Sequence, residues 1–169
     1  MQSMQHTSQR RSFLKGRFTE RAPHIRPPGA VDLFHEQCTQ CGDCARACPT
    51  GIIFRDEDGF PVINLRAGEC LFCSDCAEAC DAEAILPATA WTVRPKVDNT
   101  CLSATGVTCR TCEDQCEARA IRFTLKTGGR SVPQIDLSSC TGCGACAAPC
   151  PTRSISFFYT SSKNEETSC

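Results

Sequence analysis

Two stretches of the chain show the same alternation of apolar and polar segments. Each has a short run rich in apolar residues, a polar turn that contains glycine, and a second apolar run. The apolar runs are 52–54 with 61–65 in the first stretch and 120–125 with 132–137 in the second, and the turns are 56–59 and 127–130. This pattern is typical of strand, turn and strand, so the sequence predicts two β-hairpins.

Shorter signals flank the two hairpins. Residues 155–159 predict a final strand, and the alanine-rich segments 77–80 and 145–150 predict short helical turns. The apolar residues expected to form the core are Ile52, Phe54, Ile63, Leu65, Ile85, Ile121, Phe123, Ile135, Ile155 and Phe157. Short hairpins mixed with short helices predict an α+β fold.

Cysteine changes this picture, because 17 of the 169 residues are cysteine. The hydrophobic fraction of 41% includes them, and without them it is about 31%. A core with so few hydrophobic side chains needs cross-links in its interior. The near-neutral balance of 18 basic and 19 acidic residues argues against a general nucleic-acid binder. No run approaches the roughly 20 apolar residues that a membrane span requires, so we expect no membrane insertion.

Sixteen of the cysteines fall into four groups of four. Three groups have the spacing C-x2-C-x2-C-x3-C, whereas the third has seven residues between its first two cysteines. The groups are Cys38, Cys41, Cys44 and Cys48; Cys70, Cys73, Cys76 and Cys80; Cys101, Cys109, Cys112 and Cys116; and Cys140, Cys143, Cys146 and Cys150. Cys169 is left over, and we interpret it as an exposed spare thiol.

Disulfides, zinc ions and iron–sulfur clusters are three possible uses of these cysteines. Disulfides suit secreted chains, but residues 1–30 never join more than two large apolar residues, so they offer no signal peptide. Zinc sites combine two cysteine knuckles or a knuckle with paired histidines, and all three histidines precede the first cysteine. The run C-x2-C-x2-C-x3-C-P, present at 38–49 and 140–151, is typical of bacterial [4Fe–4S] ferredoxins. We therefore expect four [4Fe–4S] clusters, and at least three.

In such ferredoxins the fourth cysteine of a run binds the other cluster of the pair. We number the resulting ligand sets 1 to 4: Cys38, Cys41, Cys44 and Cys80; Cys70, Cys73, Cys76 and Cys48; Cys101, Cys109, Cys112 and Cys150; Cys140, Cys143, Cys146 and Cys116. The long gap in set 3 closes at little entropic cost but loses the regular amide cage of the tight loop. Three interpretations of set 3 stay open: a labile cluster suited to donation, a three-iron cluster, or no cluster.

Charge is unevenly divided between the start of the chain and the rest. Residues 1–29 carry six basic residues and one acidic residue, a net charge of +5, whereas the remainder carries −6. Residues 9–15 resemble a twin-arginine export motif, but the following stretch 16–21 is polar, so we expect no export. The start is either a solvated flexible tail or a docking arm for an acidic partner, with residues 25–29 as its semi-rigid end.

The predicted organisation is two tandem bacterial-type 2×[4Fe–4S] ferredoxin-like modules. We expect a basic flexible arm at 1–34, the first module at 35–87, a linker at 88–97, the second module at 98–160 and a tail at 161–169. The chain contains no nucleophile–base motif, P-loop or dinucleotide fingerprint, so the sequence does not predict an enzyme.

The sequence resembles the NapF family, the ferredoxin-type proteins of periplasmic nitrate reductase systems. The resemblance rests on the basic Arg10-Arg11 start, the segment 25–28 and the four cysteine groups. Above all, the segments 107–117 and 140–151 and the long third spacing look like the family's own variant, which generic ferredoxins do not share.

This resemblance implies a cytoplasmic accessory protein that contacts NapA, the catalytic subunit of periplasmic nitrate reductase, before NapA is exported. The implied role is maturation of NapA's own [4Fe–4S] cluster, by donation of a cluster or of the electrons needed to build one. Two other functions stay open: an electron-transfer relay in a respiratory or other redox chain, for which a row of clusters is suited, and a cluster-based sensor.

Overall fold

The computed structural model describes residues 24–88 and 91–160, in which every helix and strand is short. The helices are α2 (Phe34–Gln37), α3 (Asp43–Ala47), α4 (Asp75–Glu78) and α5 (Thr111–Asp114). The strands are β1 (Ile53–Arg55), β2 (Pro61–Ile63), β3 (Val93–Val97), β4 (Ile121–Leu125), β5 (Ser131–Ile135) and β6 (Ile155–Tyr159). In the described ranges, no helix is long and apolar enough to cross a membrane.

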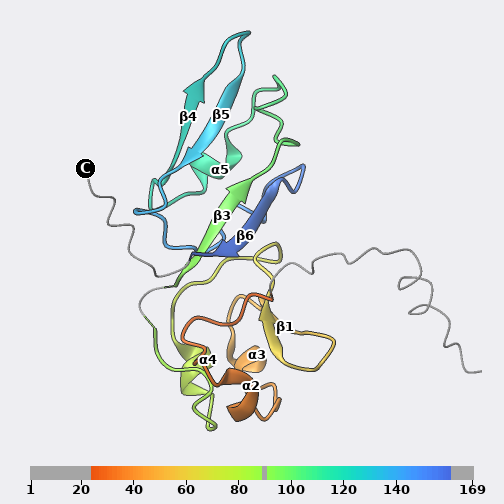
Figure 1. Ribbon diagram of the computed structural model, residues 1–169, viewed down its shortest axis with the longest axis vertical. Coiled ribbons are helices and arrows are strands. Elements are labelled where there is room, and N and C mark those ends of the chain that lie inside the picture. Colours follow the sequence, from red (N-terminus) through yellow and green to blue (C-terminus); the bar gives the residue numbers. More distant parts are fainter. Residues whose placement is uncertain (1–23, 89–90, 161–169) are drawn as a thin grey trace, which may run out of the picture.

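The elements form two lobes (Figure 1). Helices α2, α3 and α4 and strand β1 lie in one lobe, and α5 with the β4–β5 pair lies at the far end of the other. Strands β3 and β6 lie between these two groups of elements. The side chain of Phe157 in β6 packs against the buried clusters of both lobes, so this strand joins the two cores.

Both predicted hairpins are confirmed as antiparallel pairs. Strand β1 pairs with β2 in a register that sets Ile53 opposite Ile63, and β4 pairs with β5 with Ile121 opposite Ile135. The first turn is held by Asp56, whose carboxylate accepts the backbone N–H groups of Asp58 and Phe60. Such local side-chain bonds fix a turn without help from the rest of the chain, which is why the polar stretch signals it.

The predicted linker 88–97 contains strand β3, which pairs antiparallel with β6. Within it Val93 is fully buried, and Trp91 just before it is 6% exposed. Pro95 lies in the middle of this strand, opposite Phe157. Proline has no N–H for a ladder but is tolerated where only one side of a strand is paired, and the sheet has two strands. The predicted final strand, 155–159, is confirmed as the partner of β3.

The helical turns agree with the sequence only in part. The predicted turn at 77–80 overlaps α4, but 145–150 forms successive turns and not a helix. Helices α2, α3 and α5 have four or five residues each and were not predicted. A helix this short spans less than two turns, so it shows no hydrophobic period that a sequence could reveal.

The expected core is largely buried, with one exception. The predicted core residues that lie buried are Ile52, Ile63, Leu65, Ile85, Ile121 and Ile155. Phe123, Ile135 and Phe157 are half-buried and pack against the second cluster. The prediction for Phe54 was wrong: it lies in β1 with 45% of its surface exposed, because the strand alternates and Ile53 takes the inward position.

One backbone feature occurs four times, once after each cysteine group. Three residues beyond the last cysteine the chain enters the left-handed region, with φ between 50° and 63° at Gly51, Glu83, Arg119 and Arg153. The N–H of each of these residues donates to the carbonyl of that cysteine at 2.9–3.1 Å. Two residues further lies a buried isoleucine: Ile53, Ile85, Ile121 and Ile155. The turn therefore directs the chain from cysteine to core in the same way in each quarter of the molecule.

Candidate metal centres

Each predicted ligand set brings together cysteines from two different groups. Cys38, Cys41, Cys44 and Cys80, which make up set 1, line one cavity between α3 and the segment that follows α4. Cys41 is exposed and Cys44 is buried, so this set reaches from the surface into the core. Asp43 and Arg46 form an ion pair beside Cys41, and Arg46 also donates to the Cys41 carbonyl.

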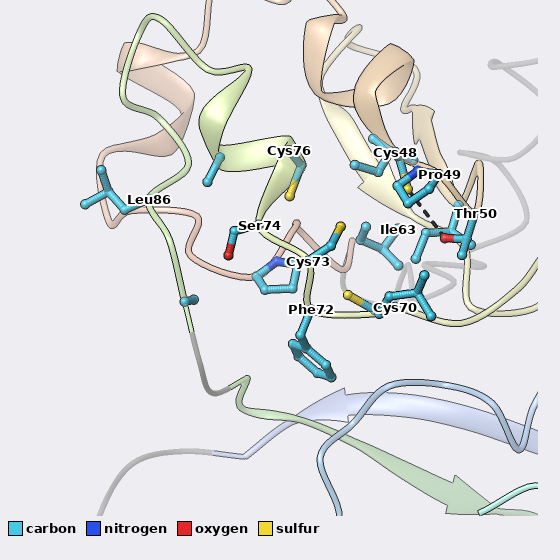
Figure 2. A pocket seen from close by; sticks show the side chains of 16 residues that line it. Cys48, Pro49, Thr50, Ile63, Cys70, Phe72, Cys73, Ser74, Cys76 and Leu86 are labelled. Atoms are coloured by element: carbon cyan, nitrogen blue, oxygen red, sulfur yellow. Dashed lines mark hydrogen bonds between the residues drawn. The ribbon is translucent and has the colours of Figure 1, made fainter. Parts of the chain in front are cut away.

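Set 2 forms the second cavity in the same lobe (Figure 2). The sulfur atoms of Cys70, Cys73 and Cys76 face it from the loop before α4 and from α4 itself, and Cys48 faces it from the end of the first group. Cys73 is exposed. Apolar residues complete the lining, among them Pro49, Ile63 and Phe72, so most of the cavity wall is free of competing polar groups.

Set 3 also lines one cavity, in spite of its unusual spacing. Cys101, Cys109, Cys112 and Cys150 all face this cavity, together with Phe123 and Ile155. The seven intervening residues fold into tight turns, in which the N–H of Thr105 donates to the Cys101 carbonyl at 3.1 Å. The buried hydroxyl of Ser103 lies 2.5 Å from the hydroxyl of Ser131 in β5. The long gap is therefore an anchored loop and not a loose one.

The cysteines of set 4 are close enough to affect one another's acidity. Burial raises the pKa of Cys140, and the thiols of Cys143 and Cys116 raise it further. Cys116 comes from the group before, and it packs against the buried cluster that contains Cys146, as the predicted crossing requires. The Cys116 sulfur accepts the backbone N–H of Ala120 at 3.3 Å.

The three tight loops share a backbone conformation that the third group lacks. In each of them the residue before the second cysteine and the residue after it have positive φ: Gln40 and Gly42, Phe72 and Ser74, Gly142 and Gly144. Alternating left- and right-handed residues turn successive N–H groups inward and form a nest for negative charge. Burial raises the pKa of Cys70 and Cys140, the cysteines that begin two of these loops, and backbone hydrogen bonding from Phe72 and Gly142 opposes that rise.

The innermost thiols are hard to ionise without a cation. Burial, with neighbouring cysteines adding to it, raises the pKa of Cys44, Cys76 and Cys112 to about 11 and that of Cys146 to about 12. Thiolates are the form that binds metals, so a positively charged group must offset this penalty. Four thiolates in each set, with inward N–H groups in the three tight loops, fit a metal–sulfide group of this kind.

Hydroxyl groups support two ligands in a way that sequence reasoning missed. Burial opposes ionisation of Cys48 and Cys150, but hydroxyl and backbone hydrogen bonds lower the pKa of both below the usual value. The Cys48 sulfur lies 3.5 Å from the Thr50 hydroxyl, and the Cys150 sulfur lies 3.4 Å from that of Ser154. The repeated Cys-Pro-Thr at 48–50 and 150–152 could have pointed to Thr50 and to Thr152, whose hydroxyl lies 3.8 Å from the Cys150 sulfur, but not to Ser154.

The cysteines surround cavities and do not meet at a point. Among residues 24–88 and 91–160, no three His, Cys, Asp or Glu side chains converge closely enough to hold a single metal ion. A tetrahedral zinc site places its sulfurs about 2.3 Å from one ion. The wider arrangement suits a cluster of several metal atoms with one thiolate at each corner.

Two domain families and several relatives match this arrangement. Residues 32–85 and residues 107–154 each match a 4Fe–4S dicluster domain. The chain is 41% identical to the ferredoxin-type protein NapF of Haemophilus influenzae, over 86% of this chain and 91% of that protein. It is 38% identical to NapF of Escherichia coli, over 89% and 94% of the two chains. The chain belongs to the NapF family of ferredoxin-type proteins.

Membership of this family settles the kind of cofactor. Two tandem dicluster domains and the grouped cysteines mean that the protein binds multiple [4Fe–4S] clusters. Similarity also extends to a larger redox protein, a component of the ion-translocating oxidoreductase complex of Methanosarcina acetivorans. The two are 36% identical over 70% of this chain and 46% of that protein.

The end of the predicted arm lies against the first lobe. The guanidinium of Arg26 donates to the Asp56 carboxylate at 2.8 Å and to the Pro61 carbonyl at 2.9 Å, and lies over the rings of Phe34 and Phe60. Pro27 is fully buried. The other arm residues that carry the basic charge and the twin-arginine resemblance, and the spare Cys169, lie outside the described residues.

Proposed function

We propose that this protein binds four [4Fe–4S] clusters through ligand sets 1 to 4. We further propose that it acts in the cytoplasm on NapA, the catalytic subunit of periplasmic nitrate reductase, before export. In this role it matures NapA by supplying a cluster or electrons, and it is not itself an enzyme. The observation that carries the proposal is the crossed grouping of cysteines around each cavity in a chain of the NapF family.

The number of clusters is tested by analysis of protein purified without oxygen. We expect about sixteen irons and a matching amount of acid-labile sulfide per chain, given four irons per cluster. About twelve irons would leave one set empty, and zinc in place of iron would overturn the proposal.

The crossing of ligands makes a second prediction. Cys80 lies in the second group by sequence but in set 1 by position, so Cys80→Ser is expected to alter the same electron paramagnetic resonance (EPR) signal as Cys41→Ser. Cys73→Ser, which changes set 2, is the matched control and should alter a different signal. If Cys80→Ser instead resembles Cys73→Ser, the ligands are not crossed.

The exposed ligands favour the first module as the point of exchange with a partner. Cys41 in set 1 and Cys73 in set 2 are exposed, whereas Cys101 in set 3 is buried and its loop is anchored. A partner's thiolates can replace an exposed ligand without unfolding the module. The structure thus argues against set 3 as the donor, although its spacing had suggested that role.

Maturation is tested by a transfer assay with NapA that lacks its cluster. We expect the holo-protein to load NapA, and pull-down experiments to recover unexported NapA with this protein. The matched control is a Cys41→Ser/Cys73→Ser variant, in which we expect slower loading. Equal loading of NapA in the presence and absence of the holo-protein would contradict the proposal.

The alternative function is an electron relay, which the similarity to a component of an ion-translocating oxidoreductase complex favours. A relay keeps its clusters while it passes electrons. Unchanged iron content through repeated rounds of reduction by a reductase, with no loading of NapA, would favour the relay over cluster donation.

A further inference from the structure

The ligand loops of sets 2 and 4 touch across the boundary between the two lobes. The backbone N–H of Cys70 donates to the carbonyl oxygen of Cys143 at 2.8 Å. Burial raises the pKa of Cys70, and among the thiols that raise it further is Cys143 from the other lobe. Two candidate cluster ligands from different modules are therefore separated by one hydrogen bond.

Two glycines allow this close approach. A Cβ added at Gly144 would lie 2.6 Å from Cδ2 of Leu65 and 2.8 Å from its Cβ, and one added at Gly142 would lie 2.2 Å from the Val93 carbonyl oxygen. Real Cβ atoms do not approach other atoms so closely. The loop 140–146 is thus in direct contact with the first lobe and with β3. Any side chain in place of Gly142 or Gly144 would push the loop away.

Large side chains close the boundary around this contact. Phe72 in the loop of set 2 packs edge-on against Trp91, with 6.3 Å between ring centroids. Leu65 and Trp91 are 3% and 6% exposed. At the far side, the guanidinium of Arg66 donates to the Arg153 carbonyl at 3.3 Å. Cys70 and Cys143 are themselves partly buried where the two ligand loops meet.

Within each lobe the two sets are also neighbours. Helix α3, which carries Cys44 of set 1, contacts helix α4, which carries Cys76 of set 2. In the second lobe, Cys112 of set 3 packs against the buried cluster that contains Cys146 of set 4. The sets therefore lie in the spatial order 1, 2, 4, 3, which differs from their order along the chain.

We propose that the contact between the loops 70–76 and 140–146 is an electron-transfer joint that links the two modules into one path. The inference rests on the proposed ligand sets. Covalent bonds from the Cys70 sulfur to its N–H, one hydrogen bond, and covalent bonds from the Cys143 carbonyl to its sulfur form the connection. One electron leaves a reduced centre on one side and reduces an oxidised centre on the other, with no bond or proton exchanged. The first electron comes from a low-potential one-electron donor, a reduced flavin or ferredoxin, for which dithionite substitutes in the test.

The joint is tested in full-length chains that retain only two ligand sets. Cys38→Ala/Cys41→Ala removes set 1, and Cys101→Ala/Cys109→Ala removes set 3, which leaves sets 2 and 4 across the contact. The control also lacks set 1 but carries Cys140→Ala/Cys146→Ala in place of the set 3 changes, which leaves sets 2 and 3. Each variant should hold about eight irons, given four per cluster.

The EPR spectrum of the dithionite-reduced variants gives the result. With sets 2 and 4 we expect spectra broadened by interaction between the two reduced centres, and with sets 2 and 3 two separate, narrower signals. Two separate signals from sets 2 and 4, at full iron content, would overturn the joint and leave the ligand assignment intact. Fewer than eight irons per chain would count against the ligand assignment. The glycine variants described next would then decide on the joint.

Two glycine-to-alanine variants test the joint independently, in a chain that keeps all sixteen ligand cysteines. Gly144→Ala should push loop 140–146 away from Leu65 and remove part of the broadening. Gly128→Ala is the matched control, because Gly128 lies in the turn between β4 and β5, outside the ligand loops, with φ of 78° against 91°, and its added Cβ meets no atom within 4 Å. Equal spectra for the wild type and both variants would overturn the proposal, and a loss confined to Gly144→Ala would support it.

Discussion

At the scale of single residues, the four turns that follow the cysteine groups hold strain in three places. The left-handed conformation suits Gly51, but the same conformation is adopted by Glu83, Arg119 and Arg153. An L-residue with a Cβ pays about 1–2 kcal/mol there. All three side chains are exposed, so packing does not explain their presence. The requirement that the chain turn from ligand to core within five residues explains why the strain persists.

Glu83→Gly should relieve this strain. Glycine removes the Cβ clash but loses some backbone entropy, so the variant should exceed Glu83→Ala in stability by about 1 kcal/mol. Both variants lack the carboxylate, so alanine is the control for charge. The measurement is the concentration of guanidinium chloride at which half of the cluster absorbance is lost. A higher concentration for the alanine variant than for the glycine variant would contradict the prediction.

The carboxyl of Asp56 makes a prediction about pH. Its side chain is 2% exposed, and although burial alone would raise its pKa, hydrogen bonds from Arg26 and the Phe60 N–H hold the pKa below its usual value of 3.8. Its contribution to stability is therefore complete above about pH 4 and is lost as the pH falls through the folded pKa.

Asp56→Asn is accordingly expected to lower the free energy of unfolding by about 3 kcal/mol, because it leaves a largely buried arginine without its carboxylate. The difference from wild type should stay constant between pH 8 and 5. Exposed Asp58 is the control, and Asp58→Asn should change stability little. A difference that shrinks between pH 7 and 5 would mean that Asp56 titrates in that range.

At the scale of elements, local signals were predictable and long-range ones were not. The hairpins β1–β2 and β4–β5 follow from apolar runs beside polar turns, and the ligand groups follow from cysteine spacing. Strand β3 did not, because Pro95 argues against a strand and its partner β6 lies far along the chain. The contact between Cys70 and Cys143 also escaped prediction, since no spacing encodes how two modules pack.

The long loop of set 3 behaves as an element of its own. Ser103 is 2% exposed, and its hydroxyl bond to Ser131 fixes the loop to β5. We expect Ser103→Ala to release about one quarter of the iron to a chelator faster than the rest, since one of four clusters is affected.

Ser131→Ala removes the same bond from the other side and should have the same effect. Because the two residues act as one unit, the double variant should be no more labile than either single variant. If the increases in iron release caused by the two single variants add up in the double variant, the two hydroxyls act independently.

At the scale of the whole molecule, the segment before the first module touches both lobes. The guanidinium of Arg26 binds the first lobe through Asp56, and its backbone N–H donates to the Tyr159 hydroxyl of β6 at 2.7 Å. Arg26 therefore contacts the first lobe and the strand that joins the two cores at the same time.

Tyr159→Phe removes this second contact and keeps the ring. We expect the Arg26 amide to exchange with deuterium about fivefold faster, which corresponds to about 1 kcal/mol for one hydrogen bond. The Ile63 amide, which donates to the Ile25 carbonyl at 2.7 Å, is the internal control and should keep its rate. Faster exchange at both amides would indicate general loosening of the first lobe.

The crossing of ligands between groups also orders events during synthesis. In set 1 the first cysteine to be synthesised is Cys38 and the last is Cys80. In set 3 the first is Cys101 and the last is Cys150. While the ribosome is still translating the 81–145 segment, only the first two cavities can have all their thiols. The chain can therefore complete the ligand sets of its first module before its second module is synthesised, whereas sets 4 and 3 stay incomplete until Cys146 and Cys150 have been added.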